Sequence, residues 1–500
     1  MKLIQHDQNC LTLIQTFKAR GLYFTKFSAP LIEDIAALKP RDVVNHVCSE
    51  VGAEASYITA WRSLTANKKC KAEEIDKSYQ CIKPLLNHLL ATNPGSIVSF
   101  ETDAENRFTR AFLCLQPWIK AAEHSRTLYT LDAYHSKSSY KGMYFCANAI
   151  EGEEKLVPIA FAIGSAENSD NWLWFCKNLY KALPIMNFNE SVVINDREKG
   201  IIDAVKMKLP NAFHAYCVWH IEKNINTKFR TKLEGKIWAA AKLLHVEGFN
   251  KVMEEISNLH TEAATYHNEI PSETWTLCKY PRNRFGHLTS NVSESFNSWL
   301  YDERLTELFE AIILLIRNVN TLYYNRRTTY SSVKTILLQT TTRQLQSVID
   351  KCCNRIVHQT NESVFEVKSN DDNFCVVDLA LLTCTCQQFQ QYRFPCIHAC
   401  AAILKTHQQP SQFTHFTYYT ATLQNVYKES VQPVDVKMCL SDNQTLPPAT
   451  IKQADQPRKI RLHSYGEVAP ENQITCEKCG KKDHNSRTCG RRQKKTIKKV

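Results

Sequence analysis

The stretch RTLYTLDAYHSKSSYKGMYFCANAIEGEEKLVPIAFAIGSAENSDNWLWFCKNLYKAL, residues 126–183, decides the fold class. Its runs at 127–134, 142–150 and 155–164 are short and apolar or alternating, and turn-like gaps separate them, which indicates strands. Apolar side chains at helical spacing then follow on one face of 169–183: Trp172, Phe175, Cys176, Leu179 and Leu183. Several strands followed by an amphipathic helix predict a mixed α/β domain.

The flanking sequence extends this pattern. An apolar run at 96–103 predicts a further strand before it, and 191–196, 197–209 and 212–220 predict a strand, a helix and a strand after it. Residues 221 to about 285 have helical spacing with few strand signals. The order does not specify one fold. It is compatible with a ribonuclease-H-like arrangement, in which acids on neighbouring strands and on one helix converge.

Composition shifts divide the chain into five parts. A Pro-Gly turn ends the first part, and a Gln-, Thr- and Pro-rich stretch forms the fourth. The predicted parts are an N-terminal helical region at 1–95, an α/β domain at 96–345 with its helical insertion, a zinc module at 346–408, a linker at 409–470, and a second zinc module with a basic tail at 471–500.

Overall composition limits the class of protein. The chain has 500 residues, of which 43% are hydrophobic and 22% charged, as in ordinary globular proteins. Since it has no run of about 18 apolar residues, we expect no membrane span. His6, Asp7, Gln8 and Asn9 interrupt the first apolar stretch, which argues against a signal peptide. We therefore expect the 20 cysteines to be thiols or metal ligands in a reducing compartment.

Positive charge is concentrated at the end of the chain. Residues 451–500 hold 14 Lys/Arg against 5 Asp/Glu, a net of +9 out of +12 for the whole protein. Such a tail typically meets nucleic acid or a nuclear import receptor. The alternative is a solvated tail with no specific partner.

The first metal-type cluster is LLTCTCQQFQQYRFPCIHACAAIL, residues 381–404. It contains C-x-C, nine residues and C-x-H, so two pairs of ligands could complete a tetrahedral zinc site with no open position for catalysis. The candidate ligands are Cys384, Cys386, Cys396 and His398. The alternative is an ordinary core of thiols with a polar histidine. The pattern resembles the SWIM-type zinc module, which implies two strands and a short helix over 363–406.

A second cluster, CEKCGKKDHNSRTC at 476–489, has the spacing C-x2-C-x4-H-x4-C of a CCHC zinc knuckle. Knuckles usually contact single-stranded or exposed nucleic acid. The predicted ligands are Cys476, Cys479, His484 and Cys489. Nearby cations suited to phosphate contact are Lys478, Lys481, Lys482, Arg487, Arg491 and Arg492. The 14 cysteines outside both clusters are interpreted as small buried hydrophobes.

Three carboxylates stand at predicted element ends and could hold two Mg²⁺ or Mn²⁺ ions: Asp132, Asp196 and Glu294. Each also has a structural interpretation. Asp196 could cap the following helix, Glu294 could complete a capping box, and Asp132 could be a turn residue.

Three stretches resemble the transposases of Mutator-like elements: residues 131–179, 194–225 and TSNVSESFNSWL at 289–300. The zinc modules follow in the order of that family, and the similarity covers roughly residues 30–490. The resemblance implies a ribonuclease-H-like DDE domain with a helical insertion before the glutamate. It assigns the three catalytic acids to Asp132, Asp196 and Glu294, and a Cys-x-x-His motif of DNA-contacting or structural role to Cys217 and His220.

Two departures from the family stand out. Ala133 replaces the glycine that commonly follows the first aspartate, and the N-terminal stretch has no further cysteine-histidine cluster. An active transposase would cut element ends and join 3′-hydroxyls to target DNA in the nucleus, with two structural Zn²⁺ and a catalytic pair of Mg²⁺ or Mn²⁺. The alternative is a domesticated, non-cleaving DNA-binding regulator. A weaker alternative is a zinc-dependent RNA-binding protein. Assembly into homo-oligomers stays open.

Overall fold

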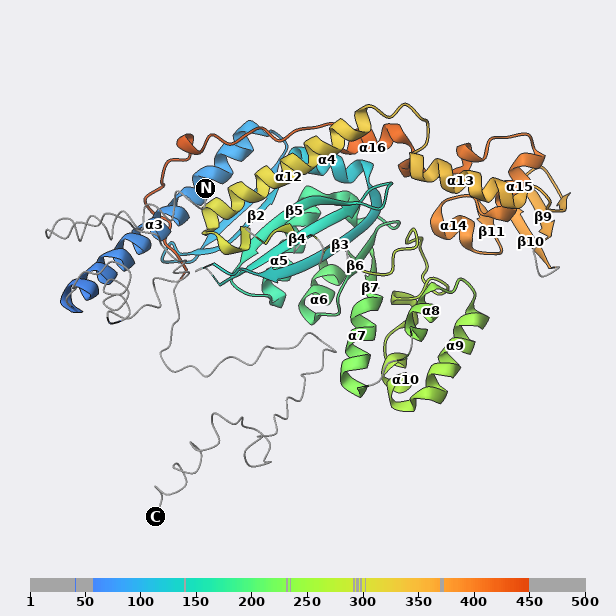
Figure 1. Ribbon diagram of the computed structural model, residues 1–500, viewed down its shortest axis with the longest axis horizontal. Helices are drawn as coiled ribbons and strands as arrows, with labels where there is room; N and C mark the ends of the chain where they lie inside the picture. The colour runs from blue at the N-terminus through green and yellow to red at the C-terminus, as the bar shows by residue number, and fades with distance from the viewer. Residues whose placement is uncertain are drawn as a thin grey trace, which may run out of the picture.

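A computed structural model of the chain describes most of the protein between Tyr57 and Pro448 (Figure 1). The described residues are 41, 57–138, 141–230, 233, 235–290, 293, 296, 299–301, 303–368 and 373–448, with the backbone alone for 57–72 and 438. No helix among them is both long and apolar enough to cross a membrane.

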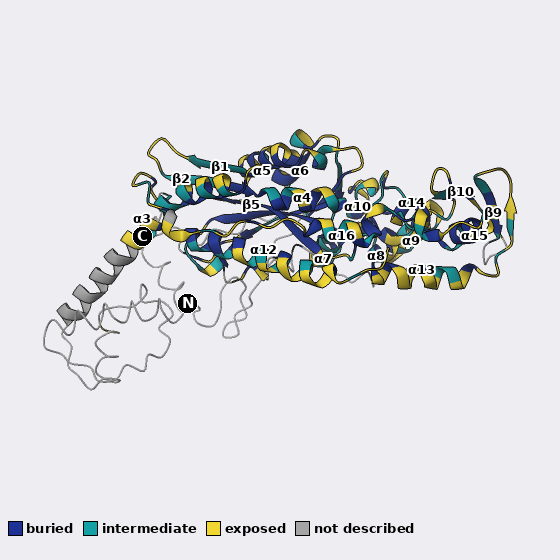
Figure 2. Ribbon diagram, turned by 90° about the horizontal axis from the view of Figure 1, so that it is seen from above, coloured by how far each residue is buried: buried dark blue, intermediate teal, exposed yellow. Residues whose placement is uncertain are grey.

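A seven-stranded mixed sheet forms the centre of the fold, in the order β1-β2-β5-β4-β3-β6-β7. The strands β3, β6 and β7 run parallel to one another, and the remaining neighbours pair antiparallel. The strands are β1 (Ile97–Thr102), β2 (Phe108–Cys114), β3 (Arg126–His135), β4 (Met143–Ile150), β5 (Leu156–Gly164), β6 (Val192–Asn195) and β7 (Phe213–Tyr216). All residues of β4 and β5 are buried, because helices cover both faces of the sheet (Figure 2).

One face of the sheet packs against α5 (Ser169–Ala182), beside which lies α6 (Lys199–Lys208). The apolar stripe predicted for this helix meets aromatic residues of β2 and β4. The rings of Phe145 and Trp172 are 4.9 Å apart, and those of Phe112 and Phe175 are 5.9 Å apart. Asn168 caps the helix by accepting from the Asn171 N–H at 2.9 Å.

The opposite face packs against a second set of helices (Figure 1). Trp118 contacts Phe161 of β5 with ring centroids 5.5 Å apart, and both side chains are fully buried. These helices are α3 (Tyr57–Thr92), α4 (Gln116–His124), α12 (Leu308–Ser331) and α16 (Thr420–Val426). The prediction of a mixed α/β domain is confirmed.

A helical unit with its own core follows β7. Its helices are α7 (Val218–Phe229), α8 (Lys236–Lys242), α9 (Val246–Leu259) and α10 (Thr261–Asn268), and a short 3-10 turn, η3 (Ser272–Thr274), follows them. Trp275 and Ile237 are buried at its centre. Helices were predicted for this stretch, and the structure has them there.

A smaller sheet lies at the far end of the molecule, in the order β11-β10-β9-β8 with antiparallel pairing. Its elements are α13 (Gln339–Cys352), β8 (Val357–Gln359), β9 (Val364–Lys368), β10 (Phe374–Asp378), β11 (Thr383–Cys384), α14 (Gln388–Tyr392) and α15 (Ile397–Lys405). Strands followed by a short helix match the expectation for residues 363–406.

Residues 410–446, which fall in the predicted linker, pack back along the α/β domain (Figure 1). Tyr427 is fully buried and its ring lies 5.3 Å from that of Tyr323 on α12. Leu446 finally pairs with Arg107 beside β2. Short 3-10 turns lie in this and other connections: η2 (Pro184–Asn187), η4 (Glu303–Leu305), η5 (Pro410–Phe413), η6 (Phe416–Tyr418) and η7 (Val436–Met438).

Local features differ from the sequence predictions. The strand β2 and the helix α4 were not predicted, and the strand predicted over 212–220 is shorter, since β7 ends at Tyr216 and α7 begins at Val218. The chain turns at η4 before α12 begins at Leu308.

Candidate functional site

The first two predicted acids lie on neighbouring parallel strands. Thr130 of β3 is in register with Ile194 of β6. Continuing this register by two residues brings Asp132 beside Asp196, which directly follows β6. Adjacent strands are about 4.8 Å apart. The two carboxylates therefore belong to the same edge of the sheet, although Asp132 lies within β3 and not at its end.

Local hydrogen bonds distinguish the two interpretations of Asp196. Its Oδ1 accepts from the backbone N–H of Glu198 at 3.2 Å. The residue that caps α6 is Glu198, whose Oε2 accepts from the Ile201 N–H at 3.0 Å. The helix-cap interpretation of Asp196 is therefore wrong.

The chain next to the third predicted acid docks on β3. Glu294 itself lies outside the described residues. The residue before it, Ser293, donates from its Oγ to Thr130 Oγ1 at 2.6 Å, and both residues are fully buried. Since side chains two residues apart on a strand share a face, Thr130 and Asp132 point to the side on which Ser293 packs.

A fourth carboxylate, Glu167, was missed from the sequence. Partial loss of water around its carboxylate, together with the nearby charges of Asp196, Glu198 and Asp132, raises the pKa of Glu167 to about 8. The residue as a whole is exposed, but its carboxylate lies close enough to these three acids to feel their charges. Its position just after β5 could have indicated the site, because the carboxyl ends of β5 and β3 lie at the same edge of the sheet.

The helical insertion contacts the residue after the second acid. Arg197 donates from Nη2 to the Tyr266 hydroxyl of α10 at 2.9 Å, and its guanidinium lies 5.8 Å from that ring. Arg197 is buried. The insertion thus fixes the backbone that carries Asp196.

Cys217 and His220 lie at the start of α7. The Cys217 sulfur is fully buried and accepts from the Ser290 N–H at 3.4 Å, and burial raises the pKa of its thiol. The His220 ring packs edge-on against Trp219 at 4.8 Å. Within the described part of the chain, no third metal-ligating side chain joins this pair in a cluster. The hydrogen bond between Cys217 and Ser290 holds the start of α7 against the segment before Ser293.

The four predicted zinc ligands of the small sheet do come together. The ligand atoms of Cys384, Cys386, Cys396 and His398 all lie within 4.8 Å of one another. Cys384 Sγ and His398 Nδ1 are 3.7 Å apart. Three sulfurs and one imidazole nitrogen suit a tetrahedral Zn²⁺, for which metal–ligand bonds of about 2.0–2.3 Å require ligands this close.

Local structure positions these ligands. β11 pairs with β10, so Cys384 sits opposite Val377, and Cys396 is the N-cap of α15 with its Sγ accepting from the Ala399 N–H at 3.4 Å. The neighbouring Cys384 and Cys396 thiols lower the pKa of the Cys386 thiol by donating to it. This is the direction that a thiolate ligand needs. The alternative of an unrelated buried core does not explain why the four donor atoms converge.

The second predicted zinc cluster and the basic tail fall outside the described residues. This applies to Cys476, Cys479, His484 and Cys489, and to Lys481, Lys482, Arg491 and Arg492. They stay predictions.

Comparisons with known proteins agree with two of these regions. The family model of the MULE transposase domain matches residues 128–224, which contain Asp132 and Asp196. The family model of the SWIM zinc finger matches residues 369–407, which contain the four converging ligands. A comparison with curated proteins found no match. The chain therefore contains a MULE transposase domain and a SWIM zinc finger, and the transposase domain points to a transposase-related family.

Proposed function

We propose that this protein is a DNA transposase of the Mutator-like type, which cuts DNA at element ends and joins the 3′-hydroxyls to target DNA. The observation that carries the proposal is the β3–β6 register, which brings Asp132 beside Asp196 at one edge of the sheet. The matching transposase domain implies DNA as the partner.

We further propose that the domain is ribonuclease-H-like. The antiparallel strands β5, β4 and β3, followed by β6 and β7 parallel to β3, support this, as do helices on both faces. In such an arrangement the acids of two central strands meet a third acid from a helix. Ser293, helical and hydrogen-bonded to β3, precedes the predicted third acid Glu294.

Asp132 and Asp196, with Glu294, would hold two Mg²⁺ or Mn²⁺ ions. Carboxylate oxygens are the ligands that these ions prefer. Burial raises the pKa of Glu167, and the charges of Asp196, Glu198 and Asp132 raise it further, a repulsion that cations would offset. When bound, such ions activate a water or a 3′-hydroxyl and stabilise the leaving oxygen.

The protein's own residues would position these acids. The Thr130–Ser293 hydrogen bond fixes Ser293, the residue before Glu294, against β3, and the Arg197–Tyr266 bond holds the backbone after Asp196. Preorganisation of this kind removes part of the entropic cost of aligning the attacking and leaving oxygens.

The remaining modules would bind and not cut. The SWIM site uses four protein ligands, which leaves no open coordination position for catalysis. We propose that the terminal knuckle and tail contact nucleic acid, and that the protein acts in the nucleus as a monomer or a homo-oligomer.

The test is cleavage and strand transfer by the purified chain on DNA that carries the flanking element ends, with Mg²⁺ or Mn²⁺. Asp132→Asn and Asp196→Asn should abolish both steps and leave DNA binding intact, because each removes a metal ligand but little packing. An Asp196→Asn variant that cleaves normally would contradict the assignment. A wild-type chain that binds DNA without cutting it would favour the domesticated regulator.

A further inference from the structure

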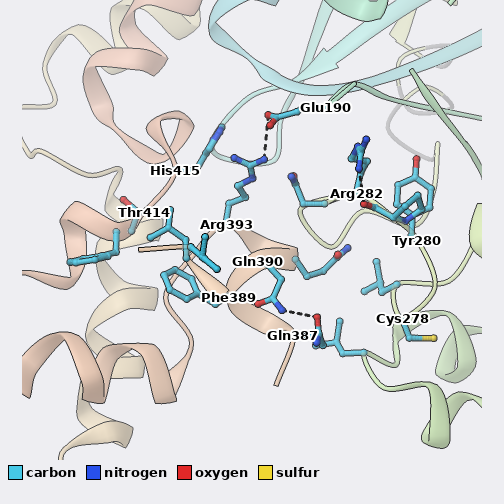
Figure 3. Close-up of a pocket in the computed structure, with 18 of the residues that line it drawn as sticks. Glu190, Cys278, Tyr280, Arg282, Gln387, Phe389, Gln390, Arg393, Thr414 and His415 are labelled. Atoms are coloured by element: carbon cyan, nitrogen blue, oxygen red, sulfur yellow. Dashed lines mark hydrogen bonds and ion pairs between the residues drawn. The ribbon is translucent and has the colours of Figure 1, made fainter. Parts of the chain in front are cut away.

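A cleft of about 620 Å³ lies where three parts of the molecule meet (Figure 3). Asn189 and Glu190 approach it from the connection before β6. Residues between 277 and 283, which follow the helical insertion, form a second wall. The third wall comes from α14 and its flanking residues in the SWIM zinc finger and from residues 412–415, which follow the finger. No role for this cleft follows from the catalytic acids.

The cleft is remote from the acids. Glu190 precedes β6 and Asp196 follows it, so the two lie at opposite edges of the sheet. Six residues of extended chain span roughly 20 Å at 3.3 Å per residue. A ligand in the cleft would therefore not occupy the cleavage site.

Four of the side chains that line the cleft already use an acceptor oxygen within the protein. Gln387 Oε1 accepts from Gln390 Nε2 at 2.6 Å, and Gln390 Oε1 accepts from the Cys384 N–H at 3.0 Å. The Glu190 carboxylate accepts from Arg393 Nη2 at 3.3 Å (Figure 3). With its amide oxygen turned toward Arg393, Asn283 accepts from Nε at 2.8 Å and Nη2 at 3.1 Å.

Donors, by contrast, are left over. Gln391 is only 7% exposed, lines the cleft, and has no partner for its Nε2 among the described residues. Arg282 donates from Nε and Nη1 to backbone carbonyls, which leaves its Nη2 group for a ligand. Arg393 donates from Nε and Nη2 to Asn283 and Glu190, which leaves its Nη1 group for a ligand. Burying an unsatisfied donor is costly, so these groups favour an occupant with acceptors.

Charge points the same way. The lining contains two arginines against one carboxylate, and that carboxylate is already paired. His415, also in the lining, stays neutral because burial lowers its pKa to about 3. A peptide brings backbone donors and acceptors in equal numbers, whereas a phosphodiester brings acceptors only. Arginine and carboxamide groups are the usual partners of nucleic-acid phosphates.

We infer that this cleft holds a nucleic-acid phosphodiester backbone, as a second contact distinct from the cleavage site. The inference rests on the proposed function in taking the nucleic acid to be DNA. At 3.4 Å per nucleotide along a strand, roughly 20 Å corresponds to at least about six nucleotides between this contact and the reacting phosphate. The SWIM zinc finger and the insertion would then grip DNA jointly.

The chain offers a matched pair of variants. Gln387→Glu keeps the acceptor for Gln390 but replaces the remaining donor with negative charge inside the cleft. Gln388→Glu makes the same charge change one residue later, where the side chain lines a different cavity on the other side of the zinc finger. Arg282→Gln removes one cation from the cleft.

The measurement is the affinity of the full-length, zinc-loaded protein for a labelled DNA duplex, and for RNA of the same sequence, over a range of salt concentrations. We expect Gln387→Glu to bind DNA about tenfold more weakly and Gln388→Glu to change affinity by less than about twofold. Arg282→Gln should reduce the slope of log K against log salt by about 0.9. Because slopes add over contacts, a basic tail that also binds DNA does not hide this change.

A photoreactive amino acid in place of Leu382, on the rim of the cleft, gives a direct readout. It should cross-link to DNA, and the same probe at the exposed Ile336, outside the cleft, should not.

If wild type binds DNA and the three variants bind equally well with unchanged slopes, the cleft is not a phosphodiester site, although the proposed function survives. Cross-linking to protein instead of DNA would also overturn the inference. Tighter binding of RNA with the same sensitivity to Gln387→Glu would keep the cleft's ligand class but reject DNA. If wild type binds no DNA at all, the proposed function itself fails.

Discussion

Replacing Arg126 should separate the α/β domain from the elements packed at its edge. Arg126 begins β3 and its side chain is fully buried. Its Nη1 donates to Glu154 at 2.6 Å and its Nη2 to the Gly152 carbonyl at 3.2 Å. Its guanidinium lies 4.8 Å from the Phe285 ring and 5.1 Å from the Tyr418 ring. One side chain therefore joins the sheet, the segment before Ser293 and the segment after the zinc finger.

The magnitude follows from what truncation leaves behind. Removing one partner of a buried ion pair costs about 3–5 kcal/mol, because the other charge stays unpaired. Glu154 is 55% exposed and keeps its contact with His287 at 2.5 Å, so we take the lower end, about 3 kcal/mol, for Arg126→Ala. Arg126→Met fills the volume between the two rings and removes the buried charge, so it should cost about 1 kcal/mol.

Urea unfolding monitored by fluorescence measures these differences, with Lys120→Ala as the control. Lys120 also pairs with a glutamate, at 2.8 Å, but on the surface, where such a pair contributes about 0.5 kcal/mol or less. With a slope of about 3 kcal/mol per M, Arg126→Ala should lower the urea midpoint by about 1 M. Hydrogen exchange should rise around Phe285 and Tyr418. A midpoint equal to that of Lys120→Ala would refute the claim that Arg126 links these parts.

Three further predictions concern the acids, the zinc and pH. Thr130→Val removes the acceptor of the Ser293 hydroxyl at a cost of about 1 kcal/mol, so strand cleavage should slow by up to about tenfold while DNA affinity stays constant; an unchanged rate would mean that this bond does not position Glu294. Cys396→Ser should lower the zinc content and speed hydrogen exchange in α15, and unchanged zinc stoichiometry would reject the ligand set. Although burial alone raises it, the pKa of Glu154 is lowered by His287 and Arg126, so its contribution to stability is present above about pH 4.5 and is lost as pH falls through the lowered value. In Glu154→Gln the urea midpoint should vary less with pH over that acidic range. A midpoint that varies with pH as in the wild type would argue against this pairing.

Periodicity was sufficient where an element buries a continuous face. The runs that became β3, β4 and β5 are apolar or alternating, and α5 carries five apolar residues on one side. The SWIM ligands were predictable because metal spacing is local: two short turns bring four donors together whatever lies around them. Both signals are contained within a few residues of chain.

Contacts between distant segments were not predictable in the same way. Residues 410–446 look polar, yet Tyr427 is buried against α12 because the few apolar residues of this segment pack on α4 and α12. Glu167 gains significance only when antiparallel pairing brings the end of β5 to the edge that holds Asp132 and Asp196. The donor excess of the cleft depends on which amide accepts from which neighbour, and spacing alone does not reveal that.

The strand β3 carries both Arg126 and the first predicted acid, Asp132. Arg126 at its start contacts the rings of Phe285 and Tyr418, and Asp132 lies six residues further along, roughly 20 Å away. The strand pairs with β4 on one side and, at 128–130, with β6 on the other, and such close packing transmits a displacement along the strand. DNA held between the zinc finger and the insertion would therefore press on the same strand that carries the first acid. If so, Arg126→Met should weaken the coupling between DNA binding and cleavage more than it weakens either DNA affinity or folding, and single-turnover cleavage at saturating DNA would show it as a slower rate at unchanged affinity.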